Sequence, residues 1–315
     1  MAENDKLKKI GGQAVIEGVM MRSPRFYAVA VRNPQGEIVV KSEPVVSLAS
    51  KYAIFKKFLL RGILVLVESL VLGIKALNYS ADIQMTELEK EKDKKPQNNT
   101  WLWFSTIAFA MIFGVGLFVI LPYWLTTKVI HYGFAFNVID GAVRIAVFVL
   151  YIYAISTMKD IRAIFRYHGA EHKAVFAQEA GEELTVENAR KYSPLHPRCG
   201  TAFLLVVMVV AIIVFSIIPI SKEWPKLYQT LAKIGIRIVF IPLIAGLSYE
   251  IIKWADRKRN AFTRMLIAPG LWLQNLTTKE PNDKEIEVAI AALKEVIRKE
   301  KESTGEADDS IEVVP

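Results

Sequence analysis

Long runs of apolar residues without charge dominate the middle of this 315-residue chain. The run from Trp101 to Leu125 has no charged residue and exceeds the length of about 20 residues that a helix needs to cross a bilayer. Trp101 and Trp124 lie near its ends, where the indole ring suits the membrane interface. Together with three later runs, this pattern predicts four transmembrane helices, at Trp101–Leu125, Asn137–Met158, Thr201–Ser221 and Leu231–Trp254.

A further apolar segment, residues 54–79, carries a charged stripe. Arg61, Glu68 and Lys75 are seven residues apart, so they share one face of a helix. No uncharged run in this segment reaches the length of about 18 residues that indicates a span. The pattern therefore predicts an amphipathic or re-entrant helix at the membrane surface.

The polar and apolar positions of the first fifty residues favour β-structure. Residues 27–32 and 37–41 are rich in β-branched and aromatic side chains, and residues 33–36, Asn-Pro-Gln-Gly, form a turn sequence between them. We therefore expect a hairpin. The preceding segment, residues 11–22, has glycines at both ends, which either turn the chain or admit close approach of a ligand.

The predicted fold is a mostly α integral membrane protein with about four transmembrane helices, an amphipathic or re-entrant helix and a small N-terminal cytoplasmic part that contains β-structure. Residues 283–301 show apolar positions at helical spacing and predict a surface helix. The expected order is a hairpin region at 1–50, the amphipathic helix at 51–86, a linker at 87–100, the membrane domain at 101–260, C-terminal cytoplasmic helices at 261–302 and a disordered tail at 303–315.

Composition and charge agree with a membrane protein. The chain is 52% hydrophobic with a mean hydropathy of +0.28, and its net charge is +8. Lys and Arg concentrate in the loop 159–200 and after residue 252, which predicts a multi-pass plasma-membrane protein with both termini in the cytoplasm. The single Cys excludes an intrachain disulfide and suits a reducing compartment. No nucleic-acid motif accompanies the positive charge, so we expect no nucleic-acid partner.

The candidate chemistry lies in the cytoplasmic loop. His168 and His172 are four residues apart and share the inward face of a predicted helix, with Glu171 between them. His196 and Cys199 follow in a second cluster. Histidine nitrogen and cysteine sulfur are preferred ligands of zinc, so the pattern predicts a zinc site formed by these four residues.

Two forms of this site remain open from the sequence. Four ligands would give a closed, structural site, whereas three would leave a position for water, with Glu171 as general base. The order H-x-x-E-H at residues 168–172 is that of a reversed metallopeptidase motif, in which a downstream acid is the third ligand. Three downstream carboxylates are candidates: Glu179, Glu183 and Glu187.

Other interpretations need no metal. The histidines could be hydrogen-bonded core residues, and Cys199 could be a small buried residue or a nucleophile activated by His196 or His172. Arg198 could bind an anionic group or simply flank a span.

Three motifs together resemble a known family. Residues 11–22 (GGQAVIEGVMMR), 168–173 (HGAEHK) and 195–201 (LHPRCGT) are similar to those of the YqhQ-like bacterial membrane proteins, and the resemblance covers residues 10–300. That family is described as a domain of unknown function and sometimes as a predicted metal-dependent enzyme. The resemblance implies a bacterial inner-membrane location and a metal, and no established reaction.

Two functions from different classes follow. The first is a zinc-dependent membrane hydrolase, peptidase-like in its motif, acting at the cytoplasmic face with His168 and His172 as ligands and Glu171 as base. The second is a membrane scaffold whose loop is held by His168, His172, His196 and Cys199. Its partners would be membrane lipid and a protein bound through the N-terminal region and the C-terminal helix.

Overall fold

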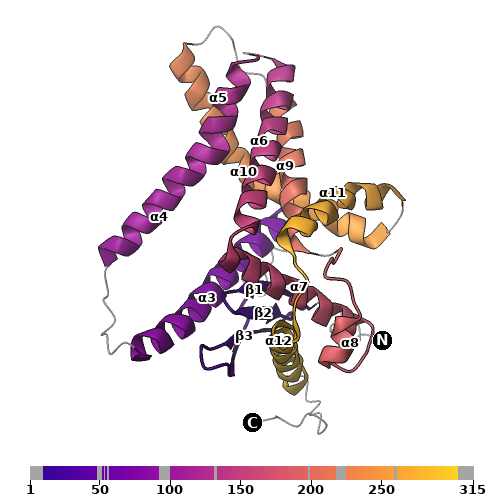
Figure 1. The fold of residues 1–315 in the computed structure, drawn as a ribbon. Coiled ribbons are helices and arrows are strands. Elements are labelled where there is room, and N and C mark those ends of the chain that lie inside the picture. Colours follow the sequence, from indigo (N-terminus) through magenta and orange to yellow (C-terminus); the bar gives the residue numbers. More distant parts are fainter. Residues whose placement is uncertain are drawn as a thin grey trace.

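The computed structural model describes residues 10–47, 52, 54, 57–91, 100–130, 133–197, 199–217, 225–258 and 261–303. Arg198, the middle of the predicted linker and the predicted tail beyond Ser303 lie outside these ranges. The described chain is mostly helical with a small N-terminal antiparallel sheet, as predicted. Figure 1 shows a lower part that contains the sheet and an upper part made of helices.

The sheet is a four-stranded meander. It consists of β1 (Gly11–Val15), β2 (Gly18–Arg22), β3 (Phe26–Arg32) and β4 (Ile38–Pro44), paired antiparallel in that order. The predicted hairpin is confirmed as β3–β4, with Val31 opposite Val39. The glycine-flanked segment 11–22 forms a second hairpin, in which Val15 pairs with Gly18 and Glu17 adopts a φ of 49°.

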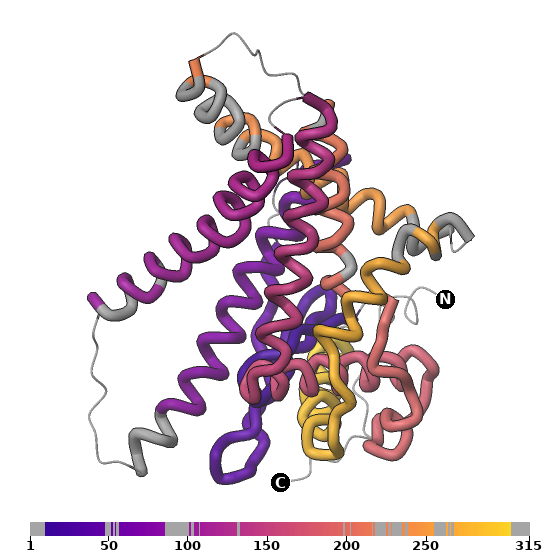
Figure 2. The backbone as a smooth tube through the Cα atoms, turned by 45° about the horizontal axis from the view of Figure 1, so that its top comes forward, coloured from indigo at the N-terminus to yellow at the C-terminus, as the bar shows by residue number. Residues whose placement is uncertain are grey.

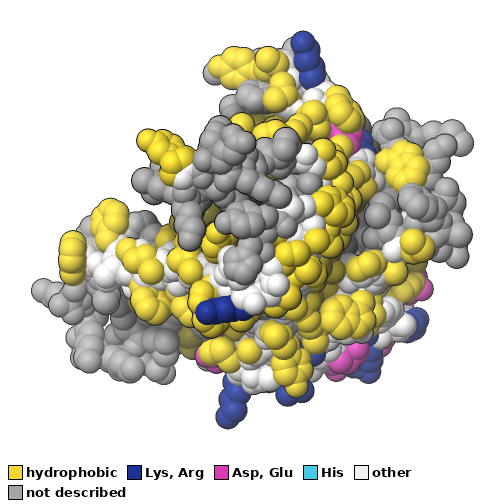
Figure 3. Space-filling model, turned by 90° about the horizontal axis from the view of Figure 1, so that it is seen from above, with side chains coloured by type: hydrophobic (Ala, Val, Ile, Leu, Met, Phe, Trp, Pro, Cys, Tyr) yellow, Lys and Arg dark blue, Asp and Glu magenta, His cyan; other side chains and the backbone are white. Residues whose placement is uncertain are grey.

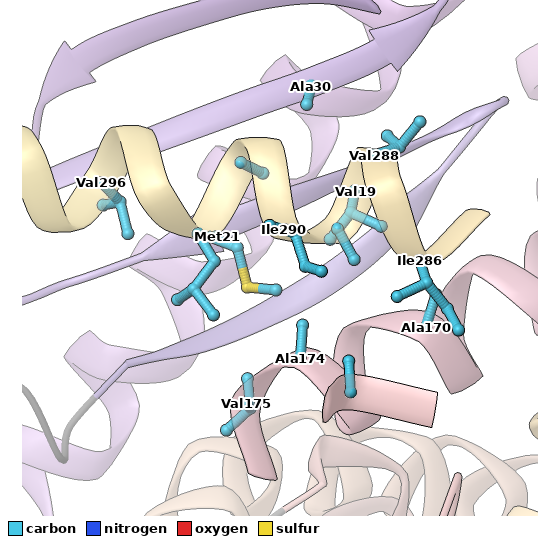
Figure 4. Packing of buried hydrophobic residues seen from close by; sticks show 14 of the residues in the cluster. Val19, Met21, Ala30, Ala170, Ala174, Val175, Ile286, Val288, Ile290 and Val296 are labelled. Atoms are coloured by element: carbon cyan, nitrogen blue, oxygen red, sulfur yellow. The ribbon is translucent and has the colours of Figure 1, made fainter. Parts of the chain in front are cut away.

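Both faces of the sheet are buried. On one face, Val19 and Met21 of β2 pack with α7 (Lys159–Glu179) and α12 (Asp283–Glu302), as Figure 4 shows. On the other face, Met20 packs with Leu72 of α3 (Leu60–Glu91). Because successive strand residues point to opposite faces, the short strand β2 contributes side chains to two separate hydrophobic cores. We call β1–β4, α7, α12 and the short α8 (Val186–Arg190) the sheet unit.

Helix α12 confirms the predicted C-terminal helix to within one residue. Asn282 and Glu285 form a capping box at its start, which satisfies amides that would otherwise lack partners. The apolar positions of α12 do not face water. Ile286 and Leu293 are 1% and 0% exposed because this face covers the sheet.

Helix α3 differs from the prediction in length and in what its charged stripe contacts. It is one helix from Leu60 to Glu91, so it continues past the expected end at residue 79 and into the predicted linker. Two of the three stripe residues face protein: Glu68 pairs with Arg22 at 3.2 Å, and the Arg61 guanidinium pairs with Glu250 at 2.5 Å, whereas Lys75 is exposed. Figure 2 shows α3 running from the sheet towards the upper helices.

The upper part is formed by the apolar helices. They are α4 (Thr100–Val115), a π-helical turn η2 (Gly116–Ile120), α5 (Leu121–Thr127), α6 (Phe134–Ser156), α9 (Gly200–Ile217) and α10 (Lys226–Lys258). Within the described residues, two segments are long and apolar enough to cross a membrane, Phe104–Thr127 and Phe134–Ser156, and Phe203–Phe215 is a shorter apolar helix. The expectation of four spans is thus met by two of the four segments on this criterion.

Many apolar side chains of these helices point outward, although Val206, Val210 and Ile244 form a small buried cluster between α9 and α10. Ile112 is 73% exposed, whereas Asp140 is 3% exposed. Asp140 pairs with Arg144 one turn away at 2.9 Å, and Arg144 also donates to Phe118 O of η2 at 2.7 Å. Seen from above, hydrophobic side chains cover most of the described surface (Figure 3).

Candidate metal centre

Three of the predicted ligands meet on one face of α7. His168 and His172 lie one helical turn apart with ring centroids separated by 4.5 Å. Cys199, immediately before α9, reaches the same place. One ligand atom from each of the three residues lies within 4.8 Å of the other two.

Backbone carbonyls orient both imidazoles. His168 Nδ1 lies 2.9 Å from Thr277 O, and His172 Nδ1 lies 2.5 Å from Pro194 O. A carbonyl oxygen only accepts hydrogen bonds, so each Nδ1 is the protonated, donating nitrogen. In the neutral rings, each Nε2 therefore carries a lone pair. Such a bond from the second ring nitrogen is the arrangement that orients metal-ligating histidines.

The two Nε2 atoms have different surroundings. His172 is 2% exposed, and its Nε2 has no hydrogen-bond partner among the described residues. A buried polar atom in this state destabilises the fold unless a ligand satisfies it. His168 Nε2 lies 3.1 Å from Cys199 Sγ, which also contacts Thr201 N and Oγ1 at 3.4 and 3.2 Å.

These donors fit a zinc ion. Ligand bonds of about 2.0–2.3 Å at tetrahedral angles place neighbouring donor atoms about 3.3–3.7 Å apart. The observed 3.1 Å between His168 Nε2 and Cys199 Sγ is close to such an edge. Two imidazoles and one thiolate supply three of four tetrahedral positions.

Glu171 lies beside this group and outside the set of three ligand atoms. The residue is 5% exposed, and its Oε2 lies 3.5 Å from His172 Nε2. A carboxylate oxygen and an imidazole lone pair repel each other at this distance unless a proton or a cation lies between them.

Gly12 of β1 packs directly on Glu171. A Cβ at Gly12 would lie 2.8 Å from Glu171 Cγ and 2.6 Å from Met20 O, so this position must be glycine for the strand to come so close. The sequence left open whether these glycines turn the chain or admit a ligand, and at Gly12 the close neighbours are a strand carbonyl and the Glu171 side chain.

His196 is adjacent to the three ligands without joining their group. Its ring centroid lies 5.6 Å from that of His172 and 4.2 Å from that of Phe176. Its Nε2 lies 3.5 Å from Glu179 Oε1. The other candidate acids, Glu183 and Glu187, are exposed residues near α8 and are outside the group.

Buried Lys173 fixes the loop that reaches His172. Its Nζ donates to Arg190 O at 3.1 Å and to Tyr192 O at 2.6 Å, and it pairs with Glu280 at 2.7 Å. The side chain is 3% exposed. These bonds hold the chain just before Pro194, whose carbonyl orients His172. This role of Lys173 could not be predicted, because a lysine in a positively charged loop is ordinarily a solvated charge.

Helix α11 (Ala261–Thr277) holds the second half of the loop. Gln274, fully buried, accepts from His196 N at 2.9 Å and donates to His196 O at 2.8 Å. Three residues later, Thr277 supplies the carbonyl that orients His168. Sequence reasoning missed both residues, because nothing in their local pattern connects them to histidines about a hundred positions earlier.

Tyr167 ties α7 to the turn between β1 and β2. Its hydroxyl donates to Glu17 Oε2 at 3.1 Å. Burial raises the pKa of Tyr167, and the neighbouring Glu17 carboxylate raises it further. The phenol therefore stays neutral and holds the turn against the helix that carries the histidines.

The fold and the site define a helical protein in which apolar helices adjoin a small sheet and a buried His-His-Cys cluster. The chain belongs to the family described as Protein of unknown function (DUF1385), whose model matches residues 58–299. It is 32% identical over 306 residues to the uncharacterized protein YqhQ of Bacillus subtilis (strain 168), with 92% of each chain covered. No solved structure matches the chain. The resemblance inferred from the three motifs is thus confirmed.

Proposed function

We propose that this protein is a zinc-dependent hydrolase embedded in the bacterial plasma membrane. The observation that carries the proposal is the paired orientation of His168 and His172. Both rings use Nδ1 on backbone carbonyls, and His172 Nε2 is buried without a hydrogen-bond partner among the described residues. Histidines that serve only to fill a core do not require a buried Nε2 atom without a hydrogen-bond partner.

Each residue has a definite role in this proposal. His168, His172 and Cys199 would hold the ion. Zinc, when bound there, would supply Lewis acidity of the kind that lowers the pKa of a water molecule to about 7. Glu171, beside His172 and outside the ligand set, would accept a proton from the attacking water, and a general base contributes about 10²–10⁴-fold in rate. The close packing of β1 at Gly12 against the Glu171 side chain restricts the position of the carboxylate.

The membrane placement extends the two apolar segments to four spans. We assign α4–α5, α6, α9 and α10 to the bilayer, with the sheet unit and both termini in the cytoplasm. The support is the outward-facing apolar surface of these helices and the excess of Lys and Arg in the loop 159–200.

Metal content tests the ligand set. Purified wild type should contain about one zinc per chain, and His172→Ala should lose it. His131→Ala is the matched control, because it removes the one histidine of the chain outside the two clusters. His196→Ala separates the two forms of the site: it should retain zinc in an open three-ligand site. Zinc-free wild type would end the proposal.

Glu171→Gln tests catalysis apart from ligation. The amide keeps the size of the side chain and cannot act as a base. We expect zinc content and folding near those of wild type, together with loss of complementation in cells that lack the gene. Full complementation by Glu171→Gln would end the hydrolase proposal even in a protein that binds zinc.

The position of His196 favours one second candidate, a membrane scaffold with a structural metal. Its ring is near enough to His172 that a small rotation would complete a closed set of four ligands. Zinc would then be lost in His196→Ala, and Glu171→Gln would be silent. A protein partner at α12 would have to use its polar face, because the apolar face covers the sheet.

A further inference from the structure

A basic hollow lies beside the start of α7, which follows α6 after two residues. Its volume is about 670 Å³, and its lining residues are Lys159, Arg162, Arg166, Lys279 and Glu280. The three residues from α7 are spaced three and four apart, so they stack on one face of the helix. The other wall is the segment that follows α11.

Gly169 allows these two walls to meet. It lies on the same face of α7, one turn beyond Arg166, and a Cβ there would lie 2.2 Å from Lys279 O. Lys279 N also donates to Phe165 O at 2.9 Å. Close backbone contacts therefore hold α7 against the segment that contains Lys279, and the cationic side chains of both line the hollow.

Positive charge in the hollow is poorly compensated. Glu280 is the one acid among the lining residues, and Lys173 already pairs with it at 2.7 Å. Arg166 pairs with Glu285 at 2.5 Å. The side chains of Arg162 and Lys159 make no hydrogen bond or ion pair with the residues that the structure describes. Two cations thus remain available to an anion.

We propose that this hollow binds the phosphate of an anionic phospholipid headgroup. A guanidinium binds phosphate through two parallel hydrogen bonds, and Lys159 begins α7, where the helix dipole favours negative charge. The volume falls within the range of about 300–1,000 Å³ that is typical of ligand sites.

The position of α6 identifies a lipid as the source of the phosphate. Helix α6 ends at Ser156 and is one of the two segments able to cross a membrane. Lys159 follows three residues later, which at about 1.5 Å per residue is the depth of the headgroups next to a spanning helix. The inference rests on the proposed membrane placement. It is independent of the metal, since His168 lies about 200° around α7 from Arg166.

The experiment uses the full chain, purified in a neutral detergent, and fluorescently labelled phosphatidylglycerol or phosphatidylcholine. Binding is followed by anisotropy. We expect phosphatidylglycerol to bind at least about tenfold more tightly than phosphatidylcholine, and Arg162→Glu to abolish this preference. Lys294→Glu on α12 is the matched control, because Lys294 is an equally exposed cation outside the hollow, and it should change the affinity less than twofold.

Three outcomes would overturn the proposal. One is equal binding of the two lipids by wild type. Another is an equal loss in Arg162→Glu and Lys294→Glu, which would show unspecific charge attraction. The third is displacement of the lipid by equimolar inorganic phosphate, which would identify a soluble occupant. If Arg162→Glu does not fold, the milder Lys159→Ala should still weaken phosphatidylglycerol binding about threefold or more. Zinc content should be unchanged in these variants, so failure here is distinguishable from failure of the metal site.

Discussion

The sheet unit and the apolar helices use the same kinds of residue in opposite ways. In the sheet unit, Leu293 of α12 is 0% exposed and sits among strand residues. In the apolar helices, Leu150 of α6 is 65% exposed, while Asp140 of the same helix is buried. The sheet unit thus keeps this apolar side chain inside, whereas the apolar helices expose many of theirs, apart from a small buried cluster around Val206 and Ile244.

This difference is what the proposed membrane placement would require. Water drives the burial of apolar surface in the sheet unit. In a bilayer that drive is absent and unpaired polar groups are costly, which suits the inward pairing of Arg144 with Asp140 and with the carbonyl of Phe118. The proposed metal centre lies where the regions meet, with α7 from one side and α9 and α11 from the other.

Replacement of one leucine in each region should give the largest difference between the sheet unit and the apolar helices. Leu293→Ala leaves a cavity in a core that is closed on all sides, and we expect a loss of about 2–5 kcal/mol in unfolding free energy. Leu150→Ala removes outward-facing atoms and should cost less than about 0.5 kcal/mol. Denaturant unfolding of both variants in detergent measures the difference. Similar losses would show that Leu150 is buried against protein.

A charge placed on the outer surface should distinguish lipid from water as the solvent. Ile112→Lys puts an ammonium near the middle of the segment Phe104–Thr127, where insertion should become less favourable by about 2.5–3.5 kcal/mol. Val46→Lys, at a residue that is 84% exposed beside β4, should be neutral. The readout is the amount of each variant in the membrane fraction. Normal insertion of Ile112→Lys would count against this segment as a span.

The smallest expected effect concerns a tyrosine of the sheet unit. Tyr27 lies opposite Glu43 across β3 and β4, and its hydroxyl donates to Glu43 Oε2 at 2.6 Å. Burial, and then this bond, raises the pKa of Tyr27 to about 12, from 10.0. Because the folded value is the higher one, the stability this pair contributes is present below pH 10 and is lost as pH rises through about 12.

Replacement of Glu43 tests that assignment. In Glu43→Gln, the pKa of Tyr27 should fall towards 10 while remaining raised by burial. A difference ultraviolet titration, each protein minus its Tyr27→Phe variant, isolates this phenol from the other tyrosines. An unchanged titration would mean that the strand pair leaves the carboxylate out of reach.

Elements with a strong local signal could be predicted from the sequence. The turn Asn33-Pro34-Gln35-Gly36 gave the β3–β4 hairpin, and apolar spacing gave α12. The β1–β2 hairpin was missed because its turn is Ile16-Glu17. Glutamate at positive φ is uncommon, so this turn lacks the usual Gly or Asn signal. The charged residues after position 86 suggested a linker although such residues also form helices readily, and α3 continues through them to Glu91.

Only those features of the candidate site that depend on residues close together in the sequence could be predicted. The spacing of His168 and His172 placed two candidate ligands on one face of a helix. Local residues also separate α7 from α8, with Gly181 at φ 74° and the Thr185 side chain accepting from Asn188 N. The partners that orient the rings are backbone carbonyls, which every residue possesses. No side-chain pattern could have selected Thr277 or Pro194. The pairing of Arg61 with Glu250 was likewise hidden by a separation of 189 residues.

Because both faces of the sheet are buried, the sheet can be completed only after a helix near the end of the described chain has been synthesised. The strands end at Pro44, but the helix that closes one of their faces spans Asp283–Glu302 and is among the last parts of the described chain to be made. At about 5–20 residues per second, a ribosome needs about 10–50 s to cover that distance. During this interval Val19 and Met21 lack their C-terminal cover, so the nascent sheet is exposed to chaperones and proteases for far longer than a hairpin takes to form. Completion of the chain, and not formation of the strands, is therefore the step that commits the sheet unit to its native state.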